Sequence, residues 1–188
     1  MSRALIHLAG LVLVGAWLSA CAKPPETPAA QMEAADEAVR ARDFETALTL
    51  YDGLIDWKGE GQVSAGERFK ASLESVKCLI ALGRAQEGVD RYQQMFGQYG
   101  ELTGPDAHKP TLAVLQTLVQ QKAHPDISIA FVELAQEKHP DKKENFGGLV
   151  EKIKQAGLNV EQLEKLRKLG YLSISTKPDT SRQTEEAP

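Results

Sequence analysis

Cysteine and aromatic residues are scarce in this chain, and both shortages restrict the fold. The 188 residues include two cysteines, Cys21 and Cys78, too few for a disulfide-rich scaffold or an all-cysteine tetrahedral zinc site. Aromatic side chains make up 6% of the sequence, whereas packed strands favour such side chains. The two counts argue against a disulfide-stapled secreted domain and against an aromatic-rich β-sandwich or barrel.

The chain also lacks an excess of positive charge. Its 22 lysines and arginines are outnumbered by 26 aspartates and glutamates, so the formal net charge is −4 at pH 7. General nucleic-acid binding depends on a concentrated positive surface that meets the phosphate backbone. The balance of charge therefore predicts no nucleic-acid partner.

Motifs of the common enzyme classes are missing as well. The chain has no Gly-x-Ser-x-Gly nucleophile motif, no Gly-x4-Gly-Lys-Ser/Thr phosphate loop and no His-Glu-x-x-His zinc motif. We therefore expect no enzymatic activity, no metal, no cofactor and no small-molecule substrate, and we expect the histidines in solvated turns. One alternative stays open, a small envelope enzyme or accessory subunit with a site of loop histidines and aspartates. The candidate residues are His108, His124, His139, Asp106, Asp126 and Asp141.

The first 20 residues are organised like a secretory signal peptide. Arg3 supplies a short basic region, and the apolar run from Ala4 to Leu18 is shorter than the roughly 20 residues that a spanning helix requires. The segment Leu18-Ser19-Ala20-Cys21 resembles the lipobox of bacterial lipoproteins, which implies cleavage before Cys21 and a diacylglycerol on its thiol. The alternatives are a plain signal peptide cut near Ser19-Ala20 and an uncleaved helix in which Cys21 is incidental.

Residues 21–30 are expected to form a tether behind this anchor. Three prolines lie between Ala22 and Ala30, a composition that favours an extended, polyproline-like spacer. In lipoproteins an aspartate after the lipidated cysteine often retains the protein in the inner membrane, and Ala22 stands there instead. The resemblance therefore implies anchoring in the outer membrane, facing the periplasm of a bacterium with two membranes.

A short pattern of a small residue followed four positions later by a large one recurs along the chain. Its copies are Ala47-x3-Tyr51, Gly88-x3-Tyr92 and a weaker Ala130-x3-Leu134, about 41 residues apart. The pattern resembles the tetratricopeptide repeat, in which a small residue lets two antiparallel helices approach and an aromatic fills the groove. That repeat is 34 residues long, and the surplus here falls in the glycine-containing segments 58–63 and 100–110.

Apolar residues spaced three and four apart predict helices along the same part of the chain. Such faces are formed by Phe69, Leu73, Val76 and Ile80, by Val89, Tyr92, Phe96 and Tyr99, by Leu112, Leu115, Leu118 and Val119, and by Ile127, Ala130, Phe131 and Leu134. The sequence predicts an all-α fold. Antiparallel helix pairs form a short tetratricopeptide-like solenoid at 31–143, followed by C-terminal capping helices at 144–172 and a disordered polar tail at 173–188.

Capping boxes mark the starts of two helices. Ser64 with Glu67, and Asn159 with Gln162, have the spacing at which the two side chains satisfy backbone amides reciprocally. Cys78 lies inside the first of these helices among apolar neighbours. We interpret it as a small buried hydrophobic residue rather than a redox or intermolecular thiol.

Binding is the function that the sequence favours. In tetratricopeptide solenoids the first helix of each pair lines a groove for a peptide or partner helix, and the resemblance places Arg40, Lys70, Lys77 and Lys122 near that surface, beside Asp36 and Glu74. The other interpretation is an ordinary solvated helix face. Trp57 is a further candidate, either as an exposed interface anchor or packed beneath its own loop.

These observations predict a membrane-anchored periplasmic scaffold or adaptor lipoprotein. It would bind an unidentified partner protein through the helical groove, in envelope assembly or secretion. The lipid anchor would confine it to the membrane and thereby raise the local concentration of its partner. A self-associating structural envelope protein is the other alternative that stays open.

Overall fold

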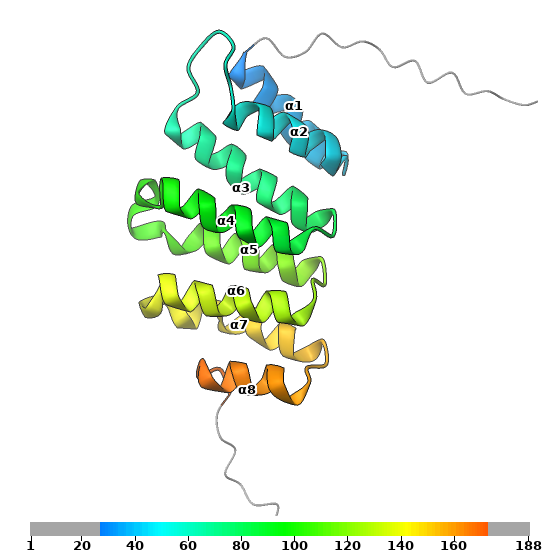
Figure 1. Ribbon diagram of the computed structural model, residues 1–188, viewed down its shortest axis with the longest axis vertical. Helices are drawn as coiled ribbons and strands as arrows, with labels where there is room; N and C mark the ends of the chain where they lie inside the picture. The colour runs from blue at the N-terminus through cyan, green and yellow to red at the C-terminus, as the bar shows by residue number, and fades with distance from the viewer. Residues whose placement is uncertain (1–26, 173–188) are drawn as a thin grey trace, which may run out of the picture.

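The protein structure is a computed structural model that describes residues 27–172, and within them it contains helices and no strand. The predicted all-α class is confirmed. Eight α-helices form a single stack with α1 and α8 at its two ends (Figure 1). They are α1 Pro28–Arg40, α2 Phe44–Ile55, α3 Ala65–Ala81, α4 Ala85–Tyr99, α5 His108–Gln120, α6 Pro125–Lys138, α7 Lys143–Gln155 and α8 Val160–Lys168, with the 3-10 helices η1 Gly100–Asp106 and η2 Pro140–Lys142.

The stack has two layers. Helices α1, α2 and α3 each pack against the next helix in the chain, as do α5 and α6, and α3, α4, α5 and α6 also contact the helix two places further on. The odd-numbered helices therefore adjoin one another in one layer and the even-numbered helices in the other. In Figure 1 this is visible where α4 lies over α5 and α6 over α7.

Three turns between helices share one hydrogen-bonding pattern. In each turn one residue is left-handed, with φ of 61° at Arg42, 77° at Gly83 and 52° at Lys122. The following N–H group then donates to a carbonyl in the last turn of the preceding helix, in the bonds Asp43 to Ala38, Arg84 to Leu79 and Ala123 to Leu118. This is the Schellman motif. Its recurrence shows that α1–α2, α3–α4 and α5–α6 are built as similar helix-turn-helix units.

In the first two units the small residue and the aromatic lie where the sequence pattern predicts. Ala47 and Tyr51 are 0% and 1% exposed, and Tyr92 is 1% exposed. Gly88 is buried against α3, because a Cβ at this position would lie 2.8 Å from Ile80 Cγ1. Close approach of α4 to α3 therefore requires a residue without a side chain at this point.

The third copy of the pattern is displaced. Ala130 is exposed and Leu134 is half-buried, so the predicted burial of Ala130 is wrong. Two pairs four positions apart are buried in α6, Phe131 with Ala135 and Ser128 with Val132, and only the second pair has its small residue first; Ser128 and Val132 are 2% and 0% exposed. The shift is two residues, and two residues turn a helix by about 200°, from the core toward solvent.

Helix α3 holds the stack together because it contributes to two apolar clusters. Ala71, Cys78 and Leu79 pack with α1 and α2, whereas Val76 and Ile80 belong to the larger cluster that extends to α8. Helix α7 is part of this larger cluster through buried Phe146, Val150 and Ile153. The described chain is thus continuous from α1 to α8, with no break between separate cores.

Local sequence signals explain where several helices begin. Both predicted capping boxes are present, Ser64 with Glu67 at α3 and Asn159 with Gln162 at α8. Helix α1 begins at Pro28, three residues before the expected start of the helical repeats at residue 31. Thr27 accepts a hydrogen bond from the Ala30 N–H group, and proline is well suited to the first helical position because it lacks only an N–H that would have no partner.

Candidate functional site

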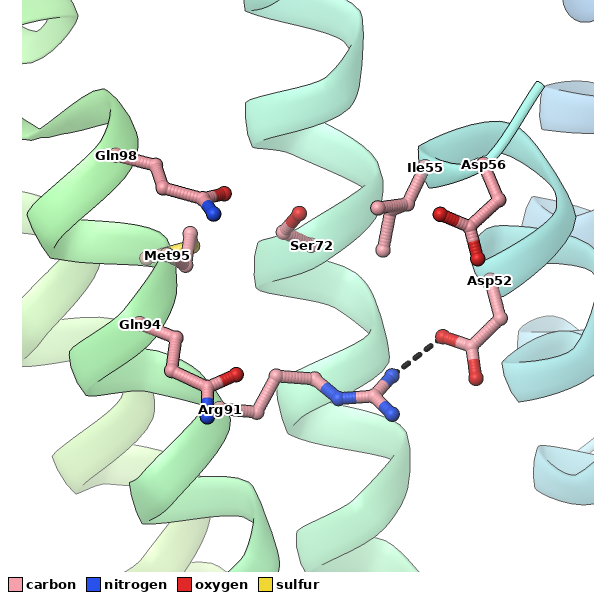
Figure 2. Close-up of a pocket in the computed structure, with 8 residues that line it drawn as sticks. All are labelled: Asp52, Ile55, Asp56, Ser72, Arg91, Gln94, Met95 and Gln98. Carbon is pink, nitrogen blue, oxygen red and sulfur yellow. Dashed lines mark hydrogen bonds and ion pairs between the residues drawn. The ribbon is translucent and has the colours of Figure 1, made fainter. Parts of the chain in front are cut away.

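A polar hollow opens between α2 and α4, with α3 as its floor (Figure 2). We call it the α2–α4 groove; its volume is about 280 Å³. It exists because α2 and α4 are successive helices of the same layer, separated by the width of α3. Its lining residues are Asp52, Ile55, Asp56, Ser72, Arg91, Gln94, Met95 and Gln98.

The Arg91 side chain spans the groove. Its guanidinium reaches from α4 across α3 and forms a hydrogen-bonded ion pair with Asp52 on α2 (Figure 2). The side chains of Arg91 and Asp52 are 27% and 41% exposed, so solvent screens the pair, and its contribution to stability is at most about 1 kcal/mol. The bond fixes where the guanidinium lies and leaves further N–H donors of Arg91 available.

Two rows of polar side chains face each other across the groove. Gln94 and Gln98 stand one turn apart on α4, and Asp52 and Asp56 stand one turn apart at the end of α2 (Figure 2). Carboxamides both donate and accept hydrogen bonds, whereas ionised carboxylates only accept. The groove therefore offers donors on one side and acceptors on both.

Ser72 supplies a polar atom on the floor. It is 5% exposed, and Figure 2 places its side chain between the two rows. The Ser72 carbonyl accepts a hydrogen bond from Ser75, but within residues 27–172 the Ser72 hydroxyl has no hydrogen-bond partner. The hydroxyl lines the open groove, where water or a ligand can satisfy it.

None of these residues was singled out by the sequence analysis. Arg91 and Asp52 are 39 positions apart, so no local motif connects them. A signal was nevertheless present, because Asp52 with Asp56, and Gln94 with Gln98, have the i, i+4 spacing that places two side chains on one helix face. Pairing the two faces requires knowledge of how α2 and α4 are arranged.

Two of the predicted partner-binding lysines lie on the odd-numbered layer and are already ion-paired. Lys70 Nζ on α3 is 3.1 Å from Asp36 Oδ2 on α1, and the Tyr51 hydroxyl donates to the same carboxylate at 2.6 Å. Burial alone would raise the pKa of Asp36, but the Tyr51 hydrogen bond and Lys70 lower it overall. Lys77 Nζ is 2.6 Å from Glu74 Oε1. These pairs leave little net positive charge there.

The other three predicted binding residues are not brought together. Arg40 is exposed at the end of α1, and Lys122 lines a different cavity, at the ends of α5, α6 and α7. The Trp57 indole N–H donates to the Glu60 carbonyl at 3.3 Å, and a Cβ at Gly59 would lie 2.8 Å from its ring. Trp57 therefore packs against its own loop, which was one of the two interpretations of this residue.

One of the candidate histidines, His139, occupies different surroundings from those expected. His139 is 6% exposed, and its Nε2 lies 2.8 Å from the Thr111 hydroxyl, which is 2.5 Å from the Tyr92 hydroxyl. The expectation of a solvated turn is wrong for His139, because its ring packs between Phe96 and Phe146. Burial lowers its pKa, as does neighbouring His108, whose buried Nδ1 has no hydrogen-bond partner among the described residues.

Two other titratable candidates, His124 and Asp126, lie together at the start of α6. His124 is exposed and caps α6, accepting from the Asp126 N–H group at 3.4 Å. Within residues 27–172 there is no group of three or more histidine, cysteine, aspartate or glutamate residues placed to hold a metal ion. Cys78 is 3% exposed, and burial raises the pKa of its thiol to about 11. The expected lipidation site, Cys21, lies outside the described residues.

The described helices, residues 27–172, include none with both the length and the apolar character to cross a bilayer.

The fold and the α2–α4 groove define the described chain as an all-α helical stack with a polar hollow in its even-numbered layer. Comparison with protein-family models, with curated proteins and with solved structures finds no match to it.

Proposed function

We propose that this chain is a lipid-anchored scaffold or adaptor that holds an extended segment of a partner protein. Cys21 would carry the lipid at the outer membrane, residues 22–27 would tether the domain on the periplasmic side, and the helix stack would resemble tetratricopeptide repeats. The observation that carries the proposal is the α2–α4 groove, an open hollow whose walls combine hydrogen-bond donors and acceptors in two rows. The sequence features around Cys21 support the anchor.

The spacing of the two rows matches an extended polypeptide. Residues four apart in a helix are separated by about 6 Å along its axis, and alternate residues of an extended chain repeat every 6.5 to 7 Å or so. Gln94 and Gln98 could therefore each meet a peptide group of the same segment, because a carboxamide complements both the N–H and the C=O of a peptide. Asp52, Asp56 and the Ser72 hydroxyl would satisfy donors on the opposite side and below.

In-cell photocrosslinking of the lipidated protein tests this proposal. A benzophenone amino acid replaces Gln98 in the groove, and a matched variant carries it at Lys70, which is exposed on the odd-numbered layer. We expect one dominant envelope protein crosslinked at Gln98 and not at Lys70. Crosslinks at Lys70 alone would assign partner binding to the odd-numbered layer, which the resemblance to tetratricopeptide repeats favours. Crosslinks at neither position would contradict partner binding by either surface.

The anchor is tested separately. Cys21→Ala removes the thiol that lipidation requires, and we expect the variant to leave the membrane fraction and to incorporate no labelled fatty acid. Persistence of both properties would contradict the lipobox interpretation and leave the groove proposal unaffected.

A second candidate function is self-association at the end of the stack. Val160 and Leu163 on α8 are 84% and 36% exposed, although the C-terminal helices were expected to cap the fold. Sedimentation of the chain over a hundredfold range of concentration would separate the candidates. A dimer that Val160→Lys dissociates would favour a structural role, and a monomer throughout would favour the scaffold.

A further inference from the structure

A second hollow, chemically unlike the α2–α4 groove, lies where the ends of α5, α6 and α7 meet. Its volume is about 560 Å³, within the range of small-molecule sites. We call it the α5–α7 cavity. Its lining residues are Leu118, Val119, Lys122, Ala123, Pro125, Ser128, Lys152, Ile153, Gln155 and Ala156.

The walls of this cavity are mostly apolar. Six of its ten lining residues have hydrocarbon side chains, and two of them, Leu118 and Ile153, are 0% and 4% exposed members of the main core. Val119, Ala123 and Pro125 are half-buried and leave apolar surface uncovered in the cavity, and covering that surface with hydrocarbon is favourable. The cavity therefore favours a ligand with an apolar body.

The charged lining residues are of one sign. Lys122 and Lys152 line the cavity, and no aspartate or glutamate does. Neither lysine forms an ion pair within residues 27–172, whereas Nζ of neighbouring Lys154 lies 2.7 Å from Oε1 of Glu151 and forms one. Charge complementarity thus calls for an anionic group on the ligand.

A serine hydroxyl adds a polar group to the wall of the cavity. Ser128, in the first turn of α6, is 2% exposed and lines the cavity. Its hydroxyl has no hydrogen-bond partner in the described part of the chain. A hydroxyl and an ammonium group can both donate hydrogen bonds to an anionic oxygen, and charge-assisted hydrogen bonds of this kind are the strong ones.

We infer that the α5–α7 cavity binds a single-chain anionic amphiphile. Its hydrocarbon chain covers Val119, Ala123 and Pro125, and its acidic head lies between Lys122 and Lys152. The head belongs to a free fatty acid or to a single-chain phospholipid, two sources of the same chemistry. This site is separate from the α2–α4 groove and does not depend on the proposed scaffold function.

The test measures binding of defined amphiphiles to the full chain carrying Cys21→Ala, which has no lipid of its own. Isothermal titration uses dodecanoate and a single-chain phosphatidylglycerol as anionic probes and dodecyltrimethylammonium as the cationic control. We expect saturable binding of an anionic probe and at least roughly tenfold weaker binding of the cation. The anionic probe that binds more tightly shows whether the head group belongs to a fatty acid or to a single-chain phospholipid. Equal affinity for anion and cation, or no saturable binding of either anion, would overturn the inference.

Two matched glycine variants keep the test independent of folding. Lys122 and Arg42 occupy the same left-handed turn position in their units, and only Lys122 lines the cavity. We expect Lys122→Gly to weaken binding of the anion about tenfold without lowering the melting temperature, and Arg42→Gly to leave affinity unchanged. Lys152→Ala should weaken binding similarly, and Lys154→Ala should not. Equal losses in the paired variants would also overturn the assignment.

Discussion

Lys122 and Arg42 are residues with side chains at positions that favour glycine. Their φ values of 52° and 61° lie in the left-handed region, and Gly83 occupies the equivalent position in the second unit with φ 77°. A residue with a Cβ in the left-handed conformation costs roughly 1–2 kcal/mol of folding free energy. Replacing it with glycine recovers only part of this free energy, because glycine loses more conformational entropy on folding. Lys122→Gly and Arg42→Gly should each raise the free energy of unfolding by about 0.5–1 kcal/mol.

Urea denaturation monitored by circular dichroism checks this prediction. Lys122→Ala serves as the control, since it removes the charge and keeps the Cβ, and it should give no comparable gain. A stabilisation of the same size in Lys122→Ala would show that the charge, and not the backbone conformation, is responsible.

Cys78 is predicted to be unreactive in the folded protein. Burial raises the pKa of its thiol to about 11, and Glu74 adds to that shift, so at pH 8 the reactive thiolate is scarce as well as shielded. Ellman's reagent should modify Cys78 slowly in buffer and rapidly in denaturant, in a chain with Cys21→Ala. Rapid modification under native conditions would contradict the burial of this side chain.

His139 should make stability depend on mildly acidic pH. Burial and neighbouring His108 and Lys138 lower its folded-state pKa, which Asp141 partly opposes. The unfolded chain, with an ordinary histidine pKa near 6.5, therefore binds a proton first, so the free energy of unfolding falls as pH drops below about 6.5. The contribution is fully present above that pH.

Denaturant midpoints between pH 7.5 and 5 would measure the effect. His139→Gln keeps an acceptor for the Thr111 hydroxyl and should flatten the pH dependence at some cost in stability. His124→Gln, at an exposed position, is the matched control and should retain the wild-type slope. An unchanged slope in His139→Gln would assign the dependence to another group.

At the scale of the helices, α4 offers two glycines with opposite roles. A Cβ at Gly88 would lie 2.8 Å from Ile80 Cγ1 and 3.2 Å from the Val76 carbonyl oxygen, whereas a Cβ at Gly97 would meet nothing within 4 Å. Gly97→Ala should stabilise the protein by about 0.5–1 kcal/mol through helix propensity. Gly88→Ala should destabilise it by about 1 kcal/mol, because overpacking at the α3–α4 contact exceeds the same gain. Thermal unfolding of the two variants measures whether the melting temperature rises for Gly97→Ala and falls for Gly88→Ala. Equal changes in melting temperature would contradict the close approach of α4 to α3 at Gly88.

The helices were predictable from sequence because their signals are local. Ser64 with Glu67 and Asn159 with Gln162 start helices through contacts three residues apart, and the apolar faces follow the helical period. The third repeat was placed two residues too late at Ala130, because a fixed repeat length cannot anticipate how the segment containing η1 changes the register of the following unit. The pattern identified the correct kind of contact and the wrong residues.

The candidate site was not predictable in the same way. Arg91, Asp52 and Ser72 come from three helices, and their meeting depends on how successive units are rotated. Lysines predicted on the groove of the first helices turned out to have partners, Asp36 and Glu74, that the sequence already placed nearby. A residue's charge is visible in a sequence, but whether that charge is neutralised depends on packing.

At the scale of the whole molecule, the stack should unfold from its ends. Helix α8 buries only Gln162 and Leu166, whereas α3 buries seven residues and belongs to both apolar clusters. In a linear array each unit is stabilised mainly by its neighbours, so a terminal helix with few buried contacts opens most easily. Hydrogen exchange measured by mass spectrometry should show fast exchange in α8 and the strongest protection in α3. Uniform protection from α1 to α8 would contradict this order.

The ion pair between Arg91 and Asp52 also has a mechanical consequence. It connects α2 and α4, two neighbours in one layer that are otherwise held apart by α3, so it limits how far the first unit can swing against the second. In a linear stack a small rotation at one joint is carried by every unit beyond it, and the far end moves the most. Because the pair is partly exposed to solvent, salt weakens it, and we expect the joint between the two units to become less restricted as the ionic strength rises.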